Sequence, residues 1–150
     1  MSFSSDIKGE LARQYSKAKH CQIAELAAMI MQEGRISMNP YSLSFDTENP
    51  MLLEKYAILL KRGFDIDVSK ELESQDCKRI VDAIQGLYLE KVCCKRAFIR
   101  GAFMASGSMS DPNKAYHFEI VCRTPEQAAM LQELMREFET KKKIVERKNH

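Results

Sequence analysis

Two stretches of this 150-residue chain, about 21–70 and about 94–148, predict the same order of secondary-structure elements. Each consists of a helix, two strands that form a hairpin, a second helix and a last strand. A repeat of this kind constrains the fold strongly, because neither copy alone could bury its apolar faces. We therefore predict an α+β fold in one domain over residues 1–150, with two central helices packed together and antiparallel sheets against them.

The first copy begins with a nearly continuous apolar run that predicts a buried helix from about Cys21 to Glu33. Alternating residues on both sides of Asn39-Pro40 predict a hairpin, and Asn49-Pro50 predicts the capped start of the next helix. Residues 64–68 alternate as a strand does. Two more helices are expected outside the repeat, over 3–15 and 76–87.

The second copy begins with another apolar helix, from Cys94 to Ser106. A turn at 111–113 separates a short strand from an alternating strand over 116–121. Thr124 is expected to cap the following helix, and residues 144–147 are predicted to form the final strand.

Small residues recur on both central helices at a spacing of four, where they allow two helix backbones to approach closely. They are Ala24 and Ala28 in the first helix, and Gly101 and Ala105 in the second. A glycine ends each helix, Gly34 and Gly107, and we expect a positive φ there as helix turns into strand.

The stretches 26–34 and 99–107 resemble the LAGLIDADG motif of homing endonucleases. The resemblance implies antiparallel sheets that form a saddle over DNA. It also implies that the last acidic position of each motif helps to bind a divalent metal at the cleaved phosphates. Those positions hold Glu33 and Ser106. A serine hydroxyl is a poor Mg²⁺ ligand, so we predict no nuclease activity, no catalytic residue and no cofactor.

Longer stretches resemble the WhiA family of bacterial regulators, namely residues 1–11, 93–104, 107–121 and 144–148. The resemblance implies a cytoplasmic, nucleoid-associated regulator of cell division, chromosome segregation or sporulation genes. Its partners would be DNA and a protein such as a sigma factor or a division protein. Whole family members carry a C-terminal helix-turn-helix domain that this chain lacks, so an N-terminal domain or a shortened form is expected. Residues 69–89 are fewer than in the family pattern, which predicts an incomplete first sheet.

Cations are the candidates for weak, phosphate-directed DNA binding, which would depend on salt. The main candidates are Arg35, Lys95, Arg96, Arg100, Lys114 and Arg123, and further candidates are Lys91 and Lys141–Lys143. For each residue alone, a solvated surface charge is the simpler interpretation. The net charge of +2 does not distinguish a DNA-binding domain from one that does not bind DNA. The alternative function is a protein-docking domain on a degenerate nuclease scaffold. No stretch is long and apolar enough for a membrane span.

Cysteine and histidine open both central helices, as His20-Cys21 and Cys93-Cys94. These pairs are expected to lie near one another, and a zinc site is one interpretation. The paired Cys-x-x-Cys spacing of many zinc sites is missing, however. The prediction is therefore buried, reduced thiols and no bound metal.

Overall fold

The computed structural model describes residues 3–68, 72–111, 113 and 117–149, with side chains as far as residue 138. The chain divides into two compact units, Met1–Ile120 and Val121–His150. The first unit contains α1 (Phe3–Ala12), α2 (Lys19–Glu33), β1 (Gly34–Ser37), β2 (Ser42–Phe45), α3 (Pro50–Phe64), α4 (Ser74–Gln85), α5 (Val92–Ser106), β3 (Gly107–Met109) and β4 (Phe118–Ile120). The second unit contains α6 (Pro125–Asn149). This mixture of helices and small antiparallel sheets confirms the predicted α+β class.

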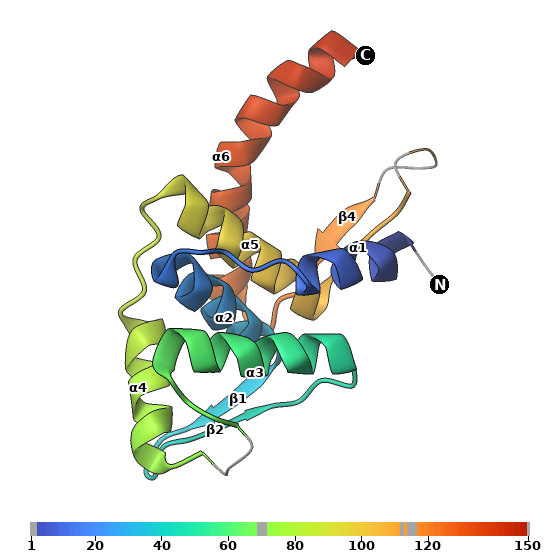
Figure 1. The fold of residues 1–150 in the computed structure, drawn as a ribbon. Helices are drawn as coiled ribbons and strands as arrows, with labels where there is room; N and C mark the ends of the chain where they lie inside the picture. Colours follow the sequence, from blue (N-terminus) through green and yellow to red (C-terminus); the bar gives the residue numbers. More distant parts are fainter. Residues whose placement is uncertain (1–2, 69–71, 112, 114–116, 150) are drawn as a thin grey trace. The chain divides into compact units, whose positions relative to one another are not determined.

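The two motif helices, α2 and α5, pack against each other at the centre of the first unit (Figure 1). They run in the same direction, because His20 meets Cys94 near both helix starts while Ala28 lies beside Gly101 further along. A Cβ atom added at Gly101 would overlap the Glu25 carbonyl oxygen and lie 3.2 Å from the Ala28 Cβ. The predicted close approach of the two backbones is confirmed at this point.

The core of the first copy lies between α2, α3 and α4: α2 contacts both α3 and α4, and α4 contacts β2. Leu59, Leu60 and Ile80 are fully buried there. Phe45 of β2 stacks on Tyr56 of α3, with ring centroids 4.4 Å apart. The hairpin is therefore fixed to the helices by its half-buried face.

Both predicted hairpins form directly after the motif helices. The first hairpin, β1-β2, pairs Gly34 with Phe45 and Ser37 with Ser42. The second hairpin, β3-β4, pairs Gly107 with Ile120 and Met109 with Phe118. Each sheet has two strands within the described part of the chain.

The predicted strand over 64–68 is wrong. Helix α3 continues through Phe64 and is capped by Asp65, whose φ of 57° is left-handed. The Ile66 amide then donates to the Leu60 carbonyl oxygen at 3.3 Å. Phe64 and Ile66 are buried on either side of this helix end, so their alternation arises from the cap and not from a pleated strand.

Two further predictions are also wrong. Residues 144–147 do not form the predicted final strand but belong to α6. This helix continues because no glycine or proline follows Pro125. The positive φ expected at Gly34 and Gly107 is also not found, because their φ angles are −83° and −97°. Glycine is needed there for space: a Cβ at Gly34 would lie 2.7 Å from the Ile30 carbonyl oxygen, and one at Gly107 would overlap the Phe103 ring.

The described helices include none with the length and apolar character needed to cross a membrane.

Candidate nucleic-acid interface

Glu33 and Ser106 stand at equivalent places, each as the last residue of a motif helix before its hairpin. Both are half-buried. The Ser106 hydroxyl donates within its own helix, to the Ala102 carbonyl oxygen at 3.4 Å. The two helix ends therefore offer one carboxylate and one neutral hydroxyl, and not a pair of acids.

Helix α1 brings a cation to the Glu33 end of the motif helices, which the sequence did not indicate. The Ser4 hydroxyl accepts a hydrogen bond from the Met109 amide at 3.2 Å, which holds α1 against the second hairpin. The Lys8 ammonium lies 5.7 Å from the centre of the Phe103 ring. Partial burial lowers the pKa of Lys8, and the Glu33 carboxylate opposes that shift.

The first hairpin carries the predicted DNA contact Arg35 at its start. Its side chain is 80% exposed and forms an ion pair with Asp46, with 3.1 Å between Nε and Oδ2. Two apolar neighbours are also exposed, Ile36 at 39% and Met38 at 47%. Successive strand residues point to opposite faces, so the Arg35 cation and the Ile36 side chain lie on different faces of the hairpin.

The second hairpin places a histidine beside an acidic residue. The exposed His117 has its Nε2 3.8 Å from Glu119 Oε1 and 3.5 Å from Ser108 Oγ. The predicted DNA contact Lys114 lies outside the described residues.

The other predicted cations do not gather on the hairpins. Lys95 and Arg96 lie near the start of α5, and Arg123 belongs to the second unit. A helix of 15 residues is about 22 Å long, so Lys95 and Arg96 are at the opposite end of the motif helices from Arg35. No side chain is described for Lys141–Lys143.

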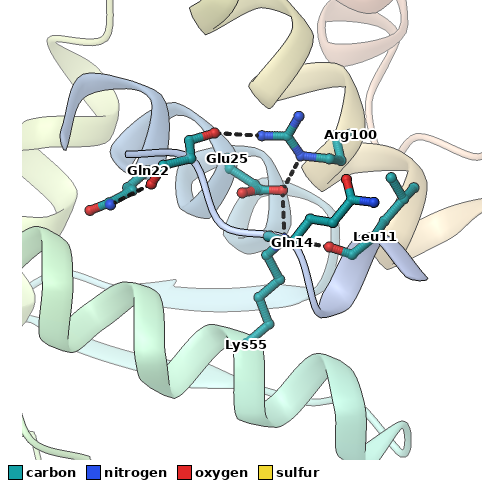
Figure 2. A network of polar contacts seen from close by, with 7 residues as sticks. Leu11, Gln14, Gln22, Glu25, Lys55 and Arg100 are labelled. Atoms are coloured by element: carbon teal, nitrogen blue, oxygen red, sulfur yellow. Dashed lines mark hydrogen bonds and ion pairs between the residues drawn. The ribbon is translucent and has the colours of Figure 1, made fainter. Parts of the chain in front are cut away.

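Arg100 belongs to a buried ion cluster, here defined as Glu25, Lys55 and Arg100 (Figure 2). One carboxylate oxygen of Glu25 accepts from both cations, at 2.6 Å from Arg100 Nε and 3.0 Å from Lys55 Nζ. The Glu25 and Lys55 side chains are 0% exposed, and that of Arg100 is 22% exposed. Arg100 thus has an internal partner that competes with any contact to DNA.

The same cluster holds the segment between α1 and α2. The Lys55 ammonium donates to the carbonyl oxygens of Leu11 and Gln14, both at 2.7 Å, while Arg100 donates to the Ser16 hydroxyl at 2.9 Å (Figure 2). Desolvation lowers the pKa of Lys55, and Glu25 opposes the shift. Glu25 is the one charged residue in the apolar run 21–32, and that isolation was the sequence signal for a buried partner.

The thiol cluster, defined as His20, Cys21, Cys93 and Cys94, is brought together as expected. His20 Nδ1 lies 3.0 Å from Cys94 Sγ and 3.5 Å from Cys21 Sγ. Cys21 and Cys94 are buried, whereas His20 and Cys93 are exposed. Burial raises the pKa of Cys21 to about 12, so this thiol is protonated at neutral pH.

Comparisons with known proteins show which proteins this chain is similar to. Residues 95–150 match the family described as the WhiA LAGLIDADG-like domain. A probable cell division protein WhiA of Lachnospira eligens is 38% identical over 182 residues, which covers 99% of this chain and 57% of that protein. The corresponding protein of Lachnoclostridium phytofermentans is 35% identical over 188 residues, covering 100% of this chain and 59% of that protein. The chain therefore spans less than two thirds of the length of these relatives.

Solved structures agree on the fold. Full-length DUF199/WhiA from Thermatoga maritima matches with a TM-score of 0.73 at 21% identity, covering 92% of this chain and 51% of that one. The N-terminal LAGLIDADG domain of DUF199/WhiA matches with a TM-score of 0.69, also at 21% identity, covering 91% of this chain and 75% of that one. The chain is similar in sequence to WhiA proteins over almost its whole length, and its fold is that of the LAGLIDADG-like domain of DUF199/WhiA.

Proposed function

We propose that this chain is a DNA-associated regulatory domain without nuclease activity, in a WhiA-type protein that acts in bacterial cell division. The cell-division role comes from the curated relatives, which bear that name. The absence of nuclease activity is proposed from the ends of the two motif helices. Glu33 ends the first helix, and Ser106 stands at the equivalent place in the second, so Glu33 has no acidic counterpart.

The charges around Glu33 support the loss of metal-dependent cleavage. Two-metal or shared-metal phosphodiester cleavage needs several hard oxygen ligands at the scissile phosphate. Here a single carboxylate has the Lys8 ammonium in its electrostatic field, which opposes the binding of another cation. A basic residue at this point suits attraction to a phosphate better than Mg²⁺ capture.

Supercoiled plasmid nicking in the presence of Mg²⁺ or Mn²⁺ tests the missing activity. The expected result is no nicking by the purified chain, and none by Ser106→Asp, because Lys8 remains beside Glu33. Metal-dependent nicking by the chain that disappears in Glu33→Gln would contradict the proposal. The Glu33→Gln preparation also controls for a contaminating nuclease.

Fluorescence anisotropy with duplex DNA at several salt concentrations tests the association itself. Affinity is expected to fall linearly on a log–log scale as salt rises, because each phosphate contact releases counterions. Arg35→Ala should weaken binding, while Lys61→Ala should not, although Lys61 also belongs to an exposed ion pair, with Asp65 at 2.8 Å. Absence of binding at the lowest salt would overturn DNA association by this domain.

The first hairpin favours a second candidate function, the docking of a protein partner. Ile36 on β1 and Met38 in the turn after it are exposed, and within the described part of the chain β1 pairs only with β2. Accessible apolar side chains beside an open strand edge can take up another protein segment. Substituting Ile36 and Met38 by Ser would leave DNA affinity unchanged if the hairpin serves docking alone, and would lower it if DNA covers this surface.

A further inference from the structure

We propose that the thiol cluster is a zinc site, in which His20, Cys21, Cys93 and Cys94 bind one Zn²⁺ across the starts of α2 and α5. One ligand atom from each residue lies within 4.8 Å of all the others. Zinc bonds of about 2.3 Å to sulfur and 2.0–2.1 Å to nitrogen put tetrahedral ligand atoms roughly 3.5–3.8 Å apart. The four atoms thus need only small side-chain movements to enclose the ion.

The ligand set suits zinc better than the other common ions. Three thiolates and one imidazole are soft or borderline ligands, and Ca²⁺ and Mg²⁺ prefer oxygen. Iron–sulfur clusters are usually held by four cysteines, whereas a Cys₃His set is common for a single structural Zn²⁺. No carboxylate belongs to the group, so zinc is the expected occupant.

The ends of the helices favour negative charge at this place. The first turns of α2 and α5 contain no acidic residue, and neither Ala18 nor Lys91 caps its helix with a side-chain hydrogen bond. Two positive helix dipoles therefore converge on the cluster without a capping carboxylate. Thiolates bound to zinc would supply the missing negative charge.

The position of the ligands in the repeat gives the site a structural consequence. His20-Cys21 and Cys93-Cys94 are the second and third residues of their helices, so each copy contributes one equivalent pair. An ion held by both pairs would clip the two motif helices together at the end that is remote from the hairpins. His20 and Cys93 are exposed, which leaves a path for the ion to enter.

Cobalt substitution of the whole chain, reduced and freed of metal with a chelator, tests the site directly. Co²⁺ is expected to bind at one ion per chain, with sulfur-to-cobalt charge transfer and the visible bands of tetrahedral cobalt, and Zn²⁺ should displace it. Cys21→Ser, Cys94→Ser and His20→Ala should each weaken binding by at least about tenfold. Cys122→Ser is the matched control, because its half-buried thiol lies outside the cluster.

Thermal unfolding provides a second readout that does not depend on the spectra of the variants. Zinc should raise the Tm of the chain and of Cys122→Ser, and should not raise the Tm of Cys94→Ser, because an ion that binds only the folded state stabilises it. Circular dichroism checks that each variant is folded before metal is added. Two results would overturn the proposal: no charge-transfer band in the reduced chain, or a disulfide between Cys21 and Cys93 or Cys94 that persists under reducing conditions without metal uptake.

Discussion

The two motif helices have the same shape and different chemistry. Both α2 and α5 have 15 residues, are followed directly by a glycine and lead into a two-stranded hairpin. Yet α2 buries Glu25 and ends in Glu33, whereas α5 supplies Arg100 and ends in Ser106. Features that determine backbone contact match between the copies, and charged groups do not.

The match and the mismatch have different physical causes. An extra Cβ at Gly101 or Gly107 meets backbone or a packed ring, and packed interiors tolerate little added volume. The charge of a helix-end residue, in contrast, is not required for packing. The copies can therefore diverge at Glu33 and Ser106 while they keep a common fold.

The buried ion cluster should give the largest effect on stability, because it joins the two copies through opposite charges. Glu25→Ala leaves Lys55 and Arg100 without their shared carboxylate. Removing one partner of a buried ion pair costs about 3–5 kcal/mol. Urea unfolding followed by circular dichroism measures the change in the free energy of unfolding.

A double variant separates the stranded charge from the lost attraction. Glu25→Leu with Lys55→Met removes both fully buried charges and should recover part of the stability lost in Glu25→Ala, since Arg100 still lacks its carboxylate and the Leu11 and Gln14 carbonyl oxygens lose their donor. If Glu25→Ala lowers the free energy of unfolding by less than about 1 kcal/mol, water or a rearranged side chain must solvate the two cations in place of the carboxylate. The copies would then be joined by packing alone.

Close packing of the motif helices should give the next largest effect. Gly101→Ala places a methyl group against the Glu25 carbonyl oxygen, so α2 and α5 must separate, at a cost of about 1–3 kcal/mol. Gly9→Ala is the matched control in helix α1. Its added Cβ would lie 3.4 Å from the flexible Met51 Cε, so helix propensity should leave the chain unchanged or more stable by up to about 1 kcal/mol. Equal effects of the two substitutions in urea unfolding would contradict the close approach.

These examples also show what the sequence could predict. The small residues at a spacing of four identified the helix interface, because that spacing follows from helix geometry. The alternation of Phe64 and Ile66 led to the wrong prediction of a strand, because buried residues on either side of a left-handed helix cap have the same pattern as a strand. The Lys8–Glu33 association had no local signature, and the isolated charge of Glu25 indicated a buried partner without identifying Lys55, because the partners lie far apart in the chain.

The N-terminal caps of α3 and α6, the equivalent helices of the two copies, should give a smaller effect on stability. The Asn49 side chain accepts from the Met51 amide at 3.0 Å, and the Thr124 hydroxyl accepts from the Gln127 amide at 3.1 Å. Replacing either residue by alanine should cost about 1 kcal/mol of helix stability. Amide hydrogen exchange should accelerate in the first turn of α3 for Asn49→Ala and of α6 for Thr124→Ala. Unchanged exchange in either helix would show that its cap is dispensable.

Arg35 should give the smallest effect on stability, because its ion pair with Asp46 is largely exposed. Exposed pairs contribute about 0.2–1 kcal/mol, so Arg35→Ala should unfold at nearly the same urea concentration as the parent chain. If Arg35 contacts phosphate, however, the substitution should reduce the slope of log affinity against log salt by about one. The Lys61→Ala control should change neither quantity by a comparable amount. A large loss of stability in Arg35→Ala would make the first hairpin a structural element of its copy, whereas an altered salt slope at constant stability would assign it to the surface that meets DNA.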